Sequence, residues 1–247
     1  MAKRELKPLS FSTTIRNPER IPIFLECIAP YDGRFLTDEV AIDVARSVIS
    51  KRVYKPITAL KTDDTMRNKF NDTSYEFDNT ELDWMIENAP QNHKEKGFSK
   101  GWASRFDTWF KIMKELGFVY YAMNEQVQLS ELGKELAKYT SYLDSSIENS
   151  LYDGGESFRN AMLNSMVKYC RANPYRRVKN NNQPFTLLLR VICGLKKLLG
   201  NEYRGIYKKE LSFFLCWQNN NADELATFIV NFRRENGLRA SDEVYYE

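Results

Sequence analysis

Two segments of the chain carry apolar residues at alternating spacings of three and four, and this repeat constrains the fold more than any other feature. The first segment follows Ser99, a suitable helix N-cap, and ends at Gly117. The second begins at Pro184 and ends at Gly200. Such spacing places apolar residues on one face of an α-helix. The two stripes are Trp102, Phe106, Trp109, Met113 and Leu116, and Phe185, Leu188, Ile192, Leu195 and Leu199.

Short strand signals follow the first of these helices. Residues 118–121 and 127–129 are strand-like runs around a turn near Asn124, and a helix is expected from Ser130. Helix, hairpin and helix form the second half of a winged helix. After the second stripe, helices are expected over residues 207–215 and from Asn221, which suggests a helix-turn-helix. The expected fold is mainly α, with tandem winged-helix or helix-turn-helix-like lobes and short β-hairpins.

The N-terminal part carries two further helix starts. Asn17 is a suitable N-cap before Pro18, and Thr37 precedes two acidic residues and valines at fourfold spacing. The polar stretch of residues 61–79 is expected to be a long loop, and residues 88–97 are expected to be a linker. These boundaries predict three parts: an arm and helical lobe over 1–90, a winged-helix-like lobe over 98–150, and a helical lobe with a basic loop over 151–247.

Charge is unevenly distributed, although the net charge of the 247 residues is only +3. Residues 168–210 hold eleven Lys or Arg and two Glu, whereas residues 72–87 hold six acidic residues and no Lys or Arg. One surface should therefore attract polyanions and another should repel them. No apolar run reaches the ~20 residues that a bilayer span requires, and the start lacks an apolar signal segment. A cytoplasmic protein without a membrane partner is expected.

Cysteine and histidine usage argues against the common metal sites. The four cysteines are far apart in apolar surroundings and form no C-x-x-C pair, so we expect buried thiols: Cys27, Cys170, Cys193 and Cys216. His93 is the single histidine and is expected to be solvated. This usage leaves little material for zinc or redox sites and for histidine-based metal clusters or triads. No catalytic residue, metal ligand or cofactor is expected within this chain.

Several polar side chains are candidates for DNA contact, because Arg and Asn can each pair with a purine edge. Some lie opposite the first apolar stripe, where the alternative is the ordinary solvated face of an amphipathic helix. Others lie in the basic loop before Pro184, where the alternative is a flexible charged loop. The candidates are Ser99, Lys100, Ser104, Arg105, Thr108, Lys111, Arg176, Arg177, Lys179, Asn180 and Asn182.

Three segments resemble the AlwI family of type IIS restriction endonucleases. Residues 12–21, reading STTIRNPERI, are similar to the T-T-[VI]-R-N-P-x-R signature near the start of that family. Residues 105–136 resemble its winged-helix segment, and residues 179–185 resemble its Asn-containing run before a Pro-Phe helix start. A more distant similarity reaches the recognition half of FokI-type enzymes. The resemblance adds Arg16, Asn17 and Arg20 as expected DNA contacts.

The resemblance implies a modular enzyme that reads an asymmetric site in double-stranded DNA as a monomer. A PD-(D/E)xK nuclease half would cut at a fixed distance using Mg2+. The single acid-x-Lys of the chain is Glu5-Leu6-Lys7, with no acid before it and no strand pattern around it. We therefore expect the nuclease to be a C-terminal domain or a separate subunit that these residues do not contain.

Two other functions remain open at this point. A winged-helix transcription regulator without any nuclease would bind DNA equally well, but it would usually be a dimer on a palindrome, whereas two unlike lobes fit an asymmetric site. A complete small nuclease with an unfamiliar active site would need a carboxylate pair with its lysine, and that pattern is not visible.

Overall fold

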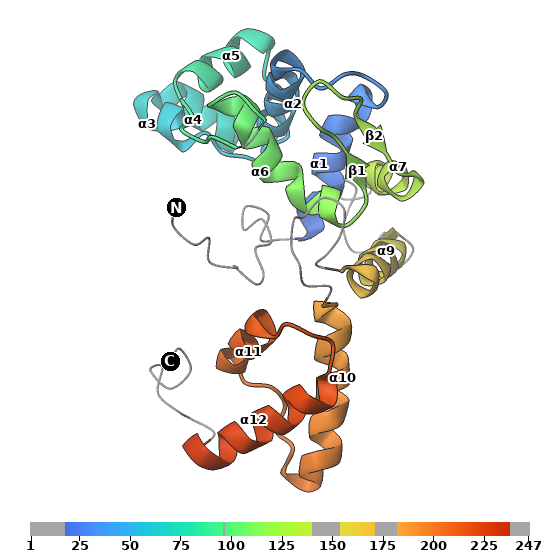
Figure 1. Cartoon of the computed structure of the whole chain (residues 1–247). Coiled ribbons are helices and arrows are strands. Elements are labelled where there is room, and N and C mark those ends of the chain that lie inside the picture. Colours follow the sequence, from blue (N-terminus) through green and yellow to red (C-terminus); the bar gives the residue numbers. More distant parts are fainter. Residues whose placement is uncertain (1–17, 96, 140–153, 171–181, 238–247) are drawn as a thin grey trace, which may run out of the picture. The chain divides into compact units, whose positions relative to one another are not determined.

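The computed structural model describes residues 18–95, 97–139, 154–170 and 182–237 (Figure 1). Its contacts divide the chain into two compact units, a first unit of residues 12–161 and a second unit of residues 162–247 together with residues 1–11. The three-part division expected from the sequence stays a prediction. Its first two parts nevertheless share the first unit, because α2 (Asp38–Ser50) packs against α6 (Trp102–Glu115).

The first unit is a helical assembly with one small hairpin (Figure 1). As expected, Thr37 caps α2, and its Oγ1 accepts a hydrogen bond of 3.2 Å from the Val40 N–H. The other elements of the first unit, in chain order, are η1 (Pro18–Arg20), α1 (Ile21–Ile28), η2 (Ala29–Tyr31), α3 (Ile57–Thr62), α4 (Asp64–Asn71), α5 (Asn79–Glu87), β1 (Val119–Tyr120), β2 (Gln128–Leu129) and α7 (Glu131–Ala137).

The expected long loop over residues 61–79 is wrong, because α3 and α4 occupy most of it. Asp63 caps α4 by accepting a 2.9 Å hydrogen bond from the Met66 N–H. Arg52 then fixes the segment, since its guanidinium donates to the carbonyls of Asp72 at 2.7 Å and Tyr75 at 2.6 Å. The prediction failed because residues 61–79 are polar and show no apolar stripe. Helix caps and the contacts of Arg52 define this region instead.

The hairpin after α6 agrees with the expected strands. β1 and β2 are antiparallel, with Val119 opposite Leu129, and Ser130 caps α7 by accepting from the Gly133 N–H. Phe35 forms an isolated bridge with Gln126, so the segment between α1 and α2 runs beside this hairpin. Four residues of the expected α6 stripe are confirmed as core, since Trp102, Phe106, Trp109 and Met113 are buried. The fifth, Leu116, is only half-buried.

The second unit is built on the pair α10 (Pro184–Leu199) and α12 (Ala222–Asn236). A Cβ at Gly194 would lie 3.0 Å from the Ala226 Cβ, so the two helices approach closely there. Asn221 caps α12, as expected, by accepting from the Glu224 N–H at 3.1 Å. The other described elements are α9 (Gly154–Lys168), which contains the boundary between the units, η4 (Gly200–Glu202), η5 (Lys208–Glu210) and α11 (Leu211–Cys216).

The apolar stripe expected on α10 is displaced. The buried face consists of Leu187, Val191 and Leu195, whereas Phe185 and Ile192 are only half-buried. The displacement has a packing reason, because α12 approaches α10 on the side that carries Gly194. The core of the second unit therefore lies about one residue position around the helix from the expected stripe.

The described chain is mainly helical with a two-stranded antiparallel sheet. Within the described ranges, no helix combines the length and the apolar character that a membrane crossing needs.

Candidate nucleic-acid interface

Six of the residues expected to contact DNA lie outside the described residues, so their positions stay predictions: Arg16, Asn17, Arg176, Arg177, Lys179 and Asn180. Arg20, at the end of η1, is exposed.

The face of α6 expected to meet DNA is covered by the chain itself. Ser104 is fully buried, and its Oγ accepts a hydrogen bond from the Glu95 N–H. Trp102 donates through Nε1 to the carbonyl of Ile86 at 3.0 Å. Part of the expected linker therefore packs onto the first turn of α6. Ser104 is an internal group here, and its contact with DNA stays a prediction.

Arg105 is engaged by the same covering segment. Its guanidinium donates to Gln91 Oε1 at 3.0 Å and to the Tyr54 hydroxyl at 3.0 Å, and it lies over the Tyr54 ring. Its Nη1 lies 2.7 Å from His93 Nε2. A guanidinium held by three partners and half-buried is a structural group here. The geometry does not favour the expected role in reading bases.

His93 is not the solvated side chain that the sequence suggested. Partial burial, followed by the positive Arg105 guanidinium, lowers the pKa of His93 from its ordinary value. A neutral imidazole can accept at Nε2 the hydrogen bond that Arg105 Nη1 donates, whereas a protonated one cannot. His93 therefore supports the covering segment in its neutral form.

The remaining candidates on α6 differ in exposure. Ser99 is exposed but does not cap the helix, since the N-cap position is Gly101 with φ of 110° and Ser99 Oγ donates to Asp38 Oδ2. Thr108 donates through Oγ1 to the Ser104 carbonyl at 3.3 Å. Lys100 is exposed and Lys111 is half-buried, so these two can still present charge to a phosphate.

Asn182 is also an internal group. It is 1% exposed, and its Nδ2 donates to the Trp217 carbonyl at 3.1 Å and to the Asn219 carbonyl at 3.5 Å. The neighbouring Gln183 N–H donates to Asn220 Oδ1 at 2.7 Å. Asn182 joins the start of α10 to the turn before α12, and its contact with DNA stays a prediction.

The open basic surface lies on α10 and the residues that follow it. Over residues 184–209 the only acidic residue is Glu202, and every Lys and Arg is exposed. These cations are Arg190, Lys196, Lys197, Arg204, Lys208 and Lys209.

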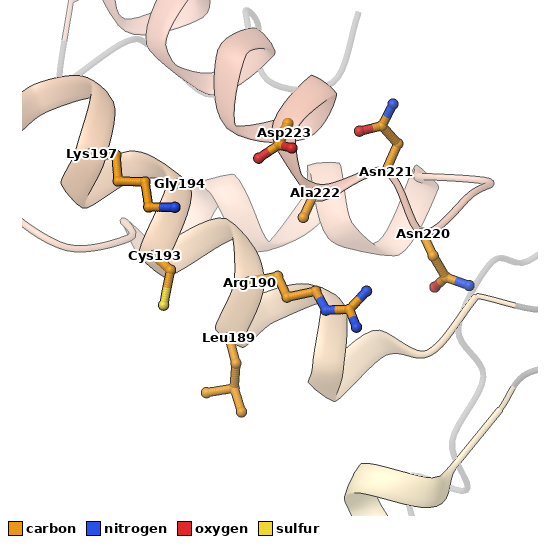
Figure 2. A pocket seen from close by; sticks show the side chains of 9 residues that line it. All are labelled: Leu189, Arg190, Cys193, Gly194, Lys197, Asn220, Asn221, Ala222 and Asp223. Carbon is orange, nitrogen blue, oxygen red and sulfur yellow. The ribbon is translucent and has the colours of Figure 1, made fainter.

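A hollow of about 420 Å³ opens between α10 and the start of α12 (Figure 2). Arg190 and Lys197 line the hollow from α10 and Asp223 lines it from the first turn of α12, whereas the Cys193 thiol points away from α12. The residues that line it are Leu189, Arg190, Cys193, Gly194, Lys197, Asn220, Asn221, Ala222 and Asp223. The sequence contained a signal for this site, because Arg190 and Lys197 are seven residues apart and so share one helix face.

The expectation of four buried thiols is only partly right. Cys27 is buried, and desolvation raises its pKa to about 12 although a hydrogen bond with Ser47 opposes the shift. Cys170 is half-buried, while Cys193 and Cys216 are exposed. Both exposed thiols lie on helices of the second unit, whose surfaces are less covered.

Comparison with known protein families gives one decisive match. The description "AlwI restriction endonuclease" applies to the family matched by residues 114–246, which is more than half of the chain. The chain belongs to the AlwI restriction endonuclease family. Comparisons with curated proteins and with solved structures give no match.

As a member of this family, the protein is a type II restriction enzyme, and its substrate is DNA. The matched range contains the hairpin, α7 and the whole described part of α10 to α12. It does not contain residues 12–21, so the similarity of that segment to the AlwI signature stays a prediction. Among the described residues, no three His, Cys, Asp or Glu side chains gather as a metal site.

Proposed function

We propose that this chain is the DNA-recognition region of a type IIS restriction endonuclease of the AlwI family, reading a short asymmetric site in double-stranded DNA. Cleavage then belongs to a PD-(D/E)xK nuclease domain or a separate subunit that uses Mg2+. The observation that carries this proposal is the exposed basic surface of α10 and residues 200–209, which lies within the family match. Such a surface supplies the electrostatic affinity that DNA binding requires.

The order of elements in the first unit supports a winged-helix role. α1, the Phe35 segment that bridges to Gln126, α2, α6 and the β1–β2 hairpin follow one another in the order of that motif, with α3 to α5 inserted. Residues 86–95 bond to the first turn of α6, so in this proposal the bases are read from other groups. Arg16 and Asn17 remain proposed readers, because Arg and Asn can pair bidentately with purines, and Arg20 remains a proposed DNA contact.

Selection from a random pool of duplex DNA at physiological salt tests the recognition role. Enrichment of one asymmetric sequence bound by a monomer is the expected result. Enrichment of a palindrome bound by a dimer would instead favour the regulator hypothesis. Arg16→Ala and Asn17→Ala should then lower the affinity for the selected site by about 1–3 kcal/mol more than the affinity for random duplex.

A plasmid assay tests the second half of the proposal. Supercoiled plasmid incubated with the chain and Mg2+ or Mn2+ should remain uncut, because the chain shows no carboxylate pair with its lysine in the PD-(D/E)xK pattern. Nicking that one carboxylate substitution abolishes would show that the chain is a complete nuclease.

A further inference from the structure

The hollow between α10 and α12 has the composition of a site for a single phosphate. Arg190 and Lys197 reach into it from one wall, and Asp223 stands on the other (Figure 2). Both cations are exposed, and within the described residues neither forms an ion pair. Their charges are therefore available to a ligand, and together they exceed the charge of Asp223 by one.

We propose that this hollow seats one phosphate of the DNA backbone between Arg190 and Lys197, and that Asp223 limits how far the phosphate enters. This site rests on the proposed function, because it fixes where the bound duplex crosses the second unit. A phosphodiester carries one negative charge, which matches the net charge of the three side chains. An Arg and a Lys one above the other on a helix can contact the same phosphate from two sides.

The geometry of α10 supplies an unusually close control. Lys196 and Lys197 are adjacent, exposed and equally charged, but adjacent residues on a helix point about 100° apart. Lys197 lines the hollow, whereas Lys196 lies over the Tyr203 ring with its Nζ 5.7 Å from the ring centroid. The sequence alone gives no reason to distinguish these two lysines, whereas the proposed site assigns a phosphate contact to Lys197 only.

The acidic wall offers a second control with the opposite sign. Asp223 and Glu224 are both exposed in the first turn of α12, but only Asp223 lines the hollow. Neutralising Asp223 removes a carboxylate that repels the phosphate, so binding should strengthen. Neutralising Glu224 changes the total charge equally and leaves the hollow unchanged.

The experiment is a titration of short labelled duplex of random sequence at about 50 and 200 mM salt, where each phosphate contact contributes about a 3.5-fold change in affinity. Because the two cations share one phosphate, Lys197→Ala and Arg190→Ala should each reduce the salt-dependent fall in affinity by up to about 3.5-fold. Lys196→Ala should reduce that fall clearly less than Lys197→Ala does, because Lys196 lies on the basic surface but outside the hollow. Asp223→Asn should tighten binding several-fold, and Glu224→Gln should have a clearly smaller effect. Circular dichroism confirms that every variant is folded.

Equal effects of Lys196→Ala and Lys197→Ala would overturn the site, because a diffuse positive surface would explain both. An unchanged or weaker affinity of Asp223→Asn would also overturn it. If the unaltered chain binds duplex and either result occurs, the site fails while the proposed function stands. If the unaltered chain binds no duplex at either salt concentration, the proposed function fails and the site falls with it.

Discussion

α6 and α10 share an amphipathic pattern, but the exposure of their polar faces differs. Each is a long amphipathic helix that ends at a glycine and carries cations on the side away from its apolar stripe. No described residue of α6 is fully exposed, and its first turn is bonded to residues 86–95 through Trp102, Ser104 and Arg105. α10 leaves Arg190, Lys196 and Lys197 exposed. An amphipathic helix thus indicates where its own core lies, but not whether another segment covers the opposite face.

The covering of one helix and the opening of the other have identifiable causes. The polar groups of Trp102, Ser104 and Arg105 find partners in residues 86–95, and this pairing holds the covering segment on α6. In the second unit, Asn182 and Gln183 bind the turn before α12 instead. Residues 182–183 are therefore anchored at the start of α10.

The largest expected difference between the units is in thiol reactivity. Cys193 and Cys216 are exposed, whereas Cys27 is buried with a pKa of about 12, raised from 9.0, which lowers its thiolate fraction by about 10³-fold. An aromatic disulfide reagent at pH 8 should modify Cys193 and Cys216 rapidly and Cys27 only on unfolding. Peptide mapping identifies the labelled sites. Rapid labelling of Cys27 would show that the first unit is as open as the second.

A second prediction concerns the buried ion pair of the second unit. Arg233 donates to Glu210 Oε1 at 2.7 Å and Oε2 at 2.8 Å, and it also donates to the Gly205 carbonyl at 2.7 Å. Arg233→Ala leaves a buried carboxylate without its partner, so the free energy of unfolding of this unit should fall by about 3–5 kcal/mol.

The adjacent exposed Arg234 is the matched control, and Arg234→Ala should change that free energy by less than about 0.5 kcal/mol. Urea denaturation followed through Trp217, which is the only tryptophan among residues 162–247, measures both variants. Similar midpoints for the two variants would contradict the assignment of Arg233 as a buried structural group.

A third prediction tests the covered face of α6. Arg105→Ala removes the charged hydrogen bonds to Gln91 and Tyr54, so the free energy of unfolding of the first unit should fall by about 1–3 kcal/mol. Lys111→Ala, on the same helix, should stay within about 0.5 kcal/mol. Loss of affinity for the selected DNA site by Arg105→Ala without any loss of stability would show that α6 reaches DNA, and the contrast with α10 would disappear.

The smallest expected effect is a pH dependence of the first unit. The pKa of His93 is lower in the folded chain, owing to burial and Arg105, so the unfolded chain binds the proton first as the pH falls. Stability is therefore complete above about pH 6.5 and decreases as the pH falls from there through the folded pKa. The loss should be less than about 1 kcal/mol, because the imidazole is only partly buried and is screened by solvent.

Comparing His93→Gln with the unaltered chain at pH 7.5 and 5.5 isolates this contribution, since the carboxylates titrate in both proteins. His93→Gln should show the shallower decline of the free energy of unfolding. If the free energy of unfolding declined equally in both proteins, His93 would not contribute to holding residues 86–95 on α6.

Much of the local structure followed from the sequence because its causes are local. Thr37, Ser130 and Asn221 cap the helices that they were expected to begin, and a capping hydrogen bond joins residues three positions apart. The failures were non-local. Residues 61–79 lack an apolar stripe, and the helix there depends on Arg52, which is distant in sequence.

The candidate site shows the same division. The sequence correctly indicated where basic residues accumulate and which family the chain resembles. It could not indicate that Ser104 and Asn182 bond to backbone groups of the chain itself, because a small polar side chain satisfies a buried backbone group as well as it satisfies a base.

The sequence by itself determined a mainly helical chain, several of its helix ends and its membership of the AlwI restriction endonuclease family, since periodicity, caps and family motifs are properties of neighbouring residues. Only the tertiary structure decided that residues 86–95 bond to the first turn of α6, that α12 shifts the buried face of α10, and that Lys197 lines a hollow while Lys196 does not. A pattern along the chain fixes directions around one helix axis. What occupies each direction depends on segments that fold back from elsewhere.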